Sequence, residues 1–317
     1  MASKLWERDL RPPQELLLLG AAVKAGLFDS LKSGPLTVQE LADTTGAGYR
    51  SLRVVLEALM DAGYLTGDGD KIDLSPDAAN MFYNTGSELY TGFSFMHGYE
   101  LCASWLKLPE VIKTGVPVKR ERSGKALKSF IQSMAVHAKK FAPVIARDII
   151  GSPGTAPRVL DIGGGPLTYA REFASLGSSV TVLDLPDVVE LMKPAIKEGE
   201  KIEMLAGDLT VGLPPGPFDL AYLGNICHIF DEDENKRLFR RVYDVLAPGG
   251  RMAIQDFVRG VSPRAAMFGV NMLVNTPGGG AWTMEQYREW ITGAGFVHIE
   301  MKDYGERQLI VSQGTVL

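Results

Sequence analysis

The first part of the chain has the hydrophobic spacing of short helices followed by a hairpin. Residues 14–28 are apolar on nearly every side, which indicates a helix buried on more than one face. Thr37 and Glu40 have the spacing of a capping box that opens a second short helix. One apolar stripe predicts a third helix over 49–62, and the Gly/Asp cluster at 67–70 suits a hairpin turn. Helix, turn, helix and hairpin together are typical of a winged-helix fold.

The pattern changes twice in the rest of the chain. Residues 84–150 have helical spacing, and the turn-rich segment 151–157 marks a boundary. After it, short β-branched runs alternate with helical segments, which predicts a mostly parallel sheet covered by helices on both faces. The last two runs must pair antiparallel, because the segment 303–307 between them is too short for a helical crossover. The predicted strands are 158–162, 180–183, 202–206, 218–223, 251–257, 297–302 and 308–312.

The sequence therefore predicts an α/β fold. Its main part is a Rossmann-like, seven-stranded, mostly parallel sheet whose last strand is antiparallel, and an α-helical winged-helix domain precedes it. We expect the winged-helix domain over residues 1–95, a helical linker that contributes to a substrate pocket over 96–150, and the sheet domain over 151–317. A chain of 317 residues is long enough for two domains.

Composition and charge exclude several classes of protein. Apolar residues make up 45% of the chain and charged residues 22%, as in soluble folded proteins. The net charge of −5 lacks the basic excess that nucleic-acid binding usually needs. The longest apolar run, 16–23, is too short to span a membrane, and Cys102 and Cys227 alone cannot form a disulfide framework. We expect a cytoplasmic protein that binds neither nucleic acid nor a membrane.

A glycine turn with acidic partners lies at the carboxyl edge of the predicted sheet. Asp161 closes the first strand, and the glycines up to Gly165 let a ligand approach the backbone. The dinucleotide fingerprint would need glycine where Thr168 stands, which disfavours a nicotinamide cofactor. Asp184 ends the second strand, at the spacing of a carboxylate that binds ribose hydroxyls, and Asp208 follows the third strand. Each residue alone could be an ordinary turn residue, but three acidic strand ends together favour a cofactor site.

These motifs resemble those of class I S-adenosylmethionine-dependent methyltransferases. More narrowly, the whole chain is similar to the caffeic-acid-type small-molecule O-methyltransferases, including bacterial relatives from pigment and polyketide pathways. The resemblance implies that S-adenosylmethionine is the cofactor and that residues 151–317 form the methyltransferase domain. The cofactor-binding residues that we expect are Asp161, Gly163, Gly165, Asp184, Leu185, Asp208, Leu209 and Asn225.

His228 is the candidate general base. It follows the fourth predicted strand, beside the expected cofactor site, and a phenolic acceptor needs a base that titrates near neutral pH. The alternative is a histidine that only packs or caps at the start of the next helix. Residues 226–228 match the family's Ile-Cys-His, whose histidine is the general base, and Asp256 takes the place of the carboxylate that orients it. The resemblance thus implies a His228–Asp256 catalytic pair. We expect no metal ion.

The chain also departs from the family at the acceptor site. Ala281 stands where the family has a second glutamate, and Gly224 and Asn225 replace its lysine and tryptophan. A related enzyme with other chemistry, such as N- or C-methylation, decarboxylation or hydroxylation, therefore remains an alternative. The family's acceptor contacts match four residues, each of which could instead be core or helix packing: Met134, His137, Met272 and Thr276.

The expected partners are a small-molecule acceptor and a second copy of the chain. The apolar helix over 14–28 cannot be covered fully by one core, so the winged-helix domain is predicted to form a homodimer. A DNA-binding regulator is the less favoured alternative. Its recognition helix would carry Arg50 and Arg53 against Glu57 and Asp61, with no net positive charge for phosphate contacts.

Overall fold

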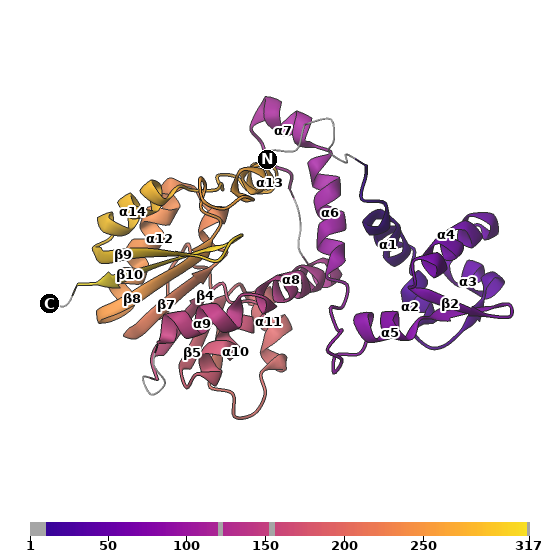
Figure 1. The fold of residues 1–317 in the computed structure, drawn as a ribbon, viewed down its shortest axis with the longest axis horizontal. Coiled ribbons are helices and arrows are strands. Elements are labelled where there is room, and N and C mark those ends of the chain that lie inside the picture. The colour runs from indigo at the N-terminus through magenta and orange to yellow at the C-terminus, as the bar shows by residue number, and fades with distance from the viewer. Residues whose placement is uncertain (1–10, 120–122, 152–155, 316–317) are drawn as a thin grey trace. The chain divides into compact units, whose positions relative to one another are not determined.

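The computed structural model describes residues 11–119, 123–151 and 156–315. The chain divides into two compact units, Met1–Cys102 and Ala103–Leu317, each described here by itself (Figure 1). The predicted division at residues 95 and 150 stays a prediction, and residues 152–155 of the segment on which the second boundary rests lie outside the described residues.

The first unit begins with two helices where one was predicted. Helix α1 spans Gln14–Lys24 and α2 spans Leu27–Leu31. The single helix expected over 14–28 is therefore wrong, because Gly26 has a left-handed backbone with φ of 76° and breaks the hydrogen-bond ladder. Gly20 in the same apolar run stays helical, and a Cβ there would lie 2.0 Å from the Tyr99 ring, so glycine allows that ring to pack against α1.

The rest of the first unit follows the predicted winged-helix order. Helix α3 (Val38–Thr45) begins with the capping box, in which Thr37 Oγ1 accepts from Glu40 N at 3.2 Å. Strands β2 (Leu65–Asp68) and β3 (Lys71–Leu74) form the hairpin, and the antiparallel sheet has the order β1–β3–β2. The remaining elements are β1 (Leu36–Thr37), α4 (Tyr49–Asp61), α5 (Pro76–Phe82) and α6 (Phe95–Trp105).

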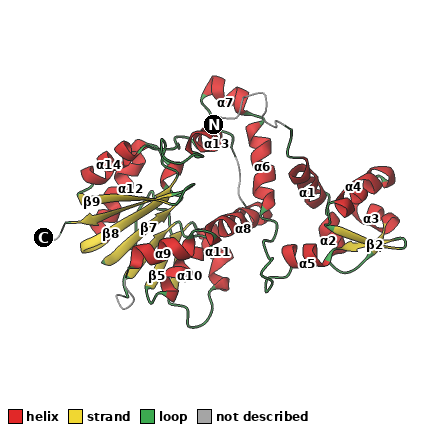
Figure 2. Ribbon diagram, viewed as in Figure 1, coloured by secondary structure: helices red, strands yellow, loops and turns green. Residues whose placement is uncertain are grey.

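The second unit contains the predicted seven-stranded sheet, in the order β6–β5–β4–β7–β8–β10–β9 (Figure 2). Strands β4 to β8 pair in parallel, and β10 pairs antiparallel with both β8 and β9, as predicted for the last two strands. The carboxyl ends of five parallel strands therefore meet at one edge. The strands are β4 (Arg158–Ile162), β5 (Ser179–Asp184), β6 (Ile202–Ala206), β7 (Phe218–Gly224), β8 (Leu246–Asp256), β9 (Phe296–Asp303) and β10 (Gln308–Gly314).

Helices cover both faces of this sheet. One face packs against α9 (Ala142–Ile150) and α10 (Thr168–Ser175), and the other against α12 (Glu232–Val245) and α14 (Met284–Gly293). The other helices of the unit are α7 (Leu108–Thr114), α8 (Gly124–Lys139), α11 (Pro186–Met192), α13 (Ala265–Asn275), and the short 3-10 helices Lys193–Ala195 and Cys227–Ile229.

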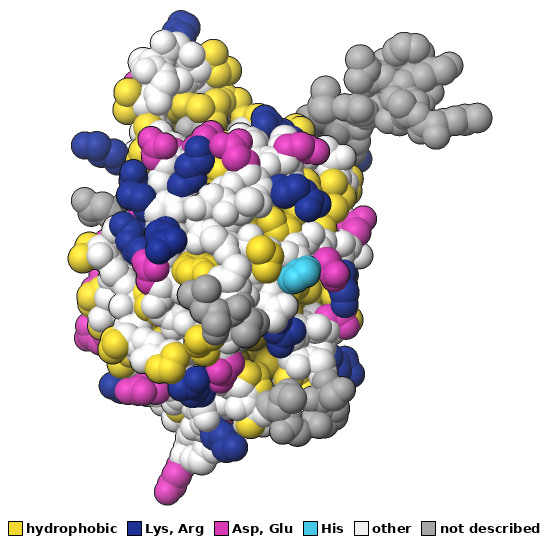
Figure 3. Space-filling model, turned by 90° about the vertical axis from the view of Figure 1, so that its left-hand side faces the viewer, with side chains coloured by type: hydrophobic (Ala, Val, Ile, Leu, Met, Phe, Trp, Pro, Cys, Tyr) yellow, Lys and Arg dark blue, Asp and Glu magenta, His cyan; other side chains and the backbone are white. Residues whose placement is uncertain are grey.

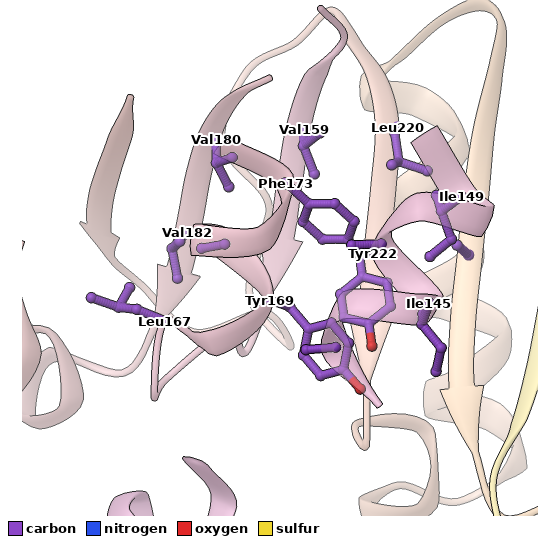
Figure 4. Close-up of a cluster of buried hydrophobic side chains, with 14 of the residues drawn as sticks. Ile145, Ile149, Val159, Leu167, Tyr169, Phe173, Val180, Val182, Leu220 and Tyr222 are labelled. Atoms are coloured by element: carbon purple, nitrogen blue, oxygen red, sulfur yellow. The ribbon is translucent and has the colours of Figure 1, made fainter. Parts of the chain in front are cut away.

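Two tyrosines in the core between the sheet and helices α9 and α10 carry hydroxyl groups toward the carboxyl ends of the strands. The rings of Tyr169 and Tyr222 lie 4.7 Å apart between their centroids, and Phe173 meets Tyr222 edge-on (Figure 4). Both hydroxyl groups point toward the carboxyl ends of the strands, and that of Tyr222 donates to Gln255 Oε1. The core therefore becomes polar just below the edge where a ligand is expected.

Positive and negative side chains lie interspersed on the face that Figure 3 shows. Among the helices that the structure describes, none is long and apolar enough to cross a membrane.

Candidate functional site

The glycine turn wraps closely around Asp161 at the end of β4. Gly163 has a left-handed φ of 71°, and a Cβ there would lie 2.3 Å from Cδ1 of Ile226. A Cβ at Gly164 would lie 2.4 Å from Oδ2 of Asp161. A side chain at either position would therefore clash, and at Gly163 the left-handed backbone also favours glycine. Gly163 and Gly165 were predicted from the sequence as site residues, but Gly164 was not, because its role depends on this contact.

Asp184, the last residue of β5, accepts a hydrogen bond from the glycine turn. Its Oδ2 accepts from Gly165 N at 2.9 Å, and its Oδ1 accepts from Leu185 N at 2.8 Å. Burial raises the pKa of this carboxyl, although both backbone hydrogen bonds oppose the shift. Each oxygen keeps a further lone pair, so Asp184 can accept two more hydrogen bonds from a ligand.

Asp161 is a buried carboxyl without a partner for one oxygen. Its side chain is 1% exposed, and Oδ2 accepts no hydrogen bond from the described residues. Burial and then the nearby charge of Asp184 raise its pKa to about 8. An unsatisfied buried acceptor is costly, so this atom indicates a cationic or hydrogen-bonding ligand.

The other predicted cofactor residues lie after the neighbouring strands. Leu185 and Asp208 are exposed and Leu209 is partly buried. Oδ1 of Asp208 accepts from both the backbone and the hydroxyl of Thr210. Asn225, one residue after β7, has a left-handed φ of 60°, and its backbone N–H donates to Gln255 O. All of them lie at the carboxyl edge, together with Asp161 and Asp184.

His228 and Asp256 form a buried pair at the same edge. Nδ1 of His228 lies 2.8 Å from Oδ1 of Asp256, and its backbone N–H donates to Oδ2 at 3.1 Å. His228 belongs to the short helix after β7, whereas Asp256 ends β8, so the parallel pairing of these strands brings the two together. Burial opposes ionisation of Asp256, but His228, the hydrogen bond from Phe257 N and the charge of Arg307 together lower the pKa of the carboxyl. The 2.8 Å distance shows that an aspartate side chain is long enough to reach the imidazole.

Two further donors fix the position of the Asp256 carboxylate. Phe257 N donates to Oδ1 at 2.8 Å, and the buried Tyr287 hydroxyl donates to Oδ2 at 3.3 Å. With both groups of His228, Asp256 accepts four hydrogen bonds. Tyr287 was missed by the sequence analysis, because its position on an amphipathic helix is also that of an ordinary core residue.

Aromatic and apolar side chains surround the imidazole. The ring of Phe268 meets that of His228 edge-on, with 4.7 Å between centroids, and Phe268 also packs on Phe257 at 4.1 Å. Ala281 is buried in the same apolar cluster as these two phenylalanines. A carboxylate at position 281 would be desolvated there, so the loss of the family's second glutamate is consistent with the packing.

The predicted acceptor residues come from two helices. Met134 is partly buried and His137 exposed on α8, where Nδ1 of His137 lies 2.6 Å from Ser133 O. Met272 is buried on α13. Thr276 follows that helix, and its hydroxyl donates to Met272 O and accepts from Gly279 N. The Thr276 hydroxyl is therefore already bonded within the chain.

The chain matches proteins of known family over most of its length. The model of the O-methyltransferase domain family matches residues 121–297. The 3-hydroxy-5-methyl-1-naphthoate 3-O-methyltransferase of Streptomyces sahachiroi is 26% identical over 298 residues, which are 87% of this chain and 84% of that protein.

Solved structures agree with the predicted fold. An O-methyltransferase family protein from Burkholderia thailandensis has a TM-score of 0.75 and 22% identity, over 96% of this chain and 95% of that one. Human N-acetylserotonin methyltransferase in complex with S-adenosylmethionine has a TM-score of 0.73 and 23% identity, over 96% and 94%. The family match covers more than half of the 317 residues, and it confirms the resemblance found in the sequence. The chain belongs to the S-adenosylmethionine-dependent O-methyltransferases.

Proposed function

We propose that this protein transfers a methyl group from S-adenosylmethionine to a hydroxyl of a small aromatic or polyketide-like molecule, with His228 as the general base. The observation that carries the proposal is the 2.8 Å contact between His228 Nδ1 and Asp256 Oδ1. It lies at the sheet edge that also holds Asp161 and Asp184.

The residues at this edge fit the cofactor. Asp184 would accept from two ribose hydroxyls, and Asp208 and Leu209 would flank the adenine. The unpartnered Oδ2 of Asp161 suits the cofactor's ammonium group, because a cationic donor would both satisfy this oxygen and favour its ionised form. When bound, the cofactor supplies an electrophilic methyl group on a sulfonium.

His228 would remove the proton of the acceptor hydroxyl. Because Nδ1 donates to Asp256, Nε2 of the neutral imidazole is the nitrogen that can accept a proton. The carboxylate of Asp256 would stabilise the imidazolium that forms. The ring of Phe268 packs against the imidazole and would offer apolar surface to an aromatic acceptor, with Met134 and Met272 as further candidate contacts.

The names of two relatives support an aromatic acceptor. The protein from Streptomyces sahachiroi is named for a hydroxynaphthoate, and the human structure for N-acetylserotonin. A panel of phenols, naphthols, amines and polyketides incubated with S-adenosylmethionine tests the proposal by release of S-adenosylhomocysteine and by product mass. Methylation at a hydroxyl is expected. Methylation at nitrogen or carbon, or a product without a new methyl group, would favour the alternative chemistry that Ala281 leaves open.

We further propose that the protein is a homodimer formed through its first unit. Helix α1 leaves Leu17 37% exposed and Ala21 exposed on one apolar side. Light scattering at micromolar concentration should give twice the 34.4 kDa mass of the single chain, and Leu17→Glu should lower the measured mass because it places a charge in the interface. A wild-type mass near that of one chain would contradict this proposal.

A further inference from the structure

Arg307 brings a positive charge to the carboxyl edge of the sheet, although nothing in the proposed mechanism uses it. It directly precedes β10, which pairs antiparallel with β8, so its side chain arrives where the parallel strands end. Nη1 donates to Oδ1 of Asn225, one residue after β7. The guanidinium lies over the ring of Phe257, one residue after β8, at 3.6 Å from the centroid.

The guanidinium is held in a fixed orientation but is not neutralised by a bound carboxylate. Stacking on an aromatic face and one hydrogen bond set the plane of the group. Among the residues that the structure describes, none forms an ion pair with Arg307, and Asn225 Oδ1 is the side-chain acceptor that it binds. Arginine has five N–H donors, so most of its donor capacity remains for another group.

Two acidic residues lie near Arg307, and neither is shown to bind its guanidinium. Glu306 pairs with Arg264, and the lone pairs of Asp256 are already used. Asp256 accepts from His228 N, His228 Nδ1, Phe257 N and the Tyr287 hydroxyl. A carboxylate offers about four lone-pair sites, so the four donors fill it. Asp256 attracts Arg307 electrostatically, but no hydrogen bond joins its carboxylate to the N–H groups of the guanidinium. Contacts within the chain therefore do not explain why a planar guanidinium is held in this orientation.

We propose that Arg307 binds a carboxylate of a ligand in this site. A partly buried guanidinium that is fixed on an aromatic ring and has free parallel donors matches the geometry of a carboxylate, which can accept two of its hydrogen bonds. This inference rests on the proposed function, which offers two sources of that group. One is the carboxylate of the cofactor's methionine part, and the other is an acid group on the aromatic acceptor.

The position of Arg307 connects it to both ligands. Arg307 donates to Asn225, the residue that follows β7. Strand β7 pairs with β4, which leads into the glycine turn of the cofactor site. The guanidinium also stacks on Phe257, which packs on Phe268, and Phe268 in turn contacts the imidazole of His228. A carboxylate at Arg307 would thus fix one end of a ligand whose reacting group lies toward His228, and it would favour ligands that carry an acid.

Binding measurements on Arg307→Met test the inference without requiring turnover. Methionine keeps apolar contact with Phe257 and removes the charge. The probes for the cofactor are S-adenosylhomocysteine and its decarboxylated analogue. The probes for the acceptor are 3-hydroxy-2-naphthoate and 2-naphthol, titrated into protein saturated with S-adenosylhomocysteine. We expect the variant to lose tenfold or more in affinity for the acid of one pair and little for its partner without the carboxylate. The affected pair identifies the source.

Two further variants make the result specific. Arg307→Lys keeps the charge but lacks the planar fork, so it should lose less affinity than Arg307→Met. Arg240→Met removes an exposed arginine of α12, which pairs with Asp244 away from this site, and should behave like the wild type. The inference is overturned if Arg307→Met binds both S-adenosylhomocysteine and 3-hydroxy-2-naphthoate as the wild type does. Failure of the wild type to bind S-adenosylhomocysteine would instead contradict the proposed function.

Discussion

Replacing His228 by alanine should lower kcat for methyl transfer by about 10²–10⁴-fold, the usual contribution of a general base. The imidazole is held by Asp256 at 2.8 Å, and its removal takes away the group proposed to accept the hydroxyl proton. The dissociation constant of S-adenosylmethionine should stay nearly unchanged, because His228 is not among the residues expected to bind it. Product formation at saturating cofactor gives kcat, and calorimetry gives the affinity.

A matched histidine variant separates the base from general damage to the fold. His298 is exposed on β9, so His298→Ala should keep the wild-type rate. If His228→Ala also retains near wild-type turnover from pH 6 to pH 9, the acceptor ionises without help and the enzyme acts by bringing the reactants together.

Replacing Asp184 by alanine should weaken S-adenosylmethionine at least about tenfold, as expected when charged hydrogen bonds to a ligand are lost. The effect has two physical sources. The ribose loses its acceptor, and Gly165 N loses the oxygen that fixes the glycine turn at 2.9 Å. Calorimetry measures the affinity, and thermal unfolding of the variant without cofactor checks that it still folds.

The exposed carboxylate of Asp187 provides the control for this variant. It lies three residues from Asp184, in the first turn of α11, so Asp187→Ala makes the same chemical change outside the site. It should leave the affinity within about twofold. Unchanged affinity in Asp184→Ala would show that this carboxylate does not hold the cofactor.

Local patterns predicted the sheet and much of the site because the relevant features lie at strand ends. Asp161 and Asp184 each follow a buried β-branched run, and parallel strands bring such ends together. The contact between His228 and Asp256 could be expected from the resemblance to the family. The structure supplies its geometry, including the short reach of the aspartate.

The features that the sequence analysis missed depend on contacts or backbone angles that no local pattern encodes. Gly20 and Gly26 lie in one apolar run, yet only Gly26 takes a left-handed φ and breaks the helix. Arg307 binds Asn225 across 82 residues, and Tyr287 binds Asp256 across 31 residues. An arginine in a short turn and a tyrosine on a helix acquire these roles only when distant segments meet.

The buried carboxyl of Asp161 couples protein stability, ligand binding and proton exchange. With a pKa raised to about 8, it is mostly protonated at neutral pH in the folded, empty protein, whereas in the unfolded chain it ionises near its ordinary value of 3.8. Its contribution to stability is therefore fully present below that ordinary value and is lost as the pH rises through about 8. A bound ammonium group would favour the ionised form. The proposed contact with the cofactor therefore predicts that binding near neutral pH releases a proton and that the binding enthalpy depends on the buffer that takes it up.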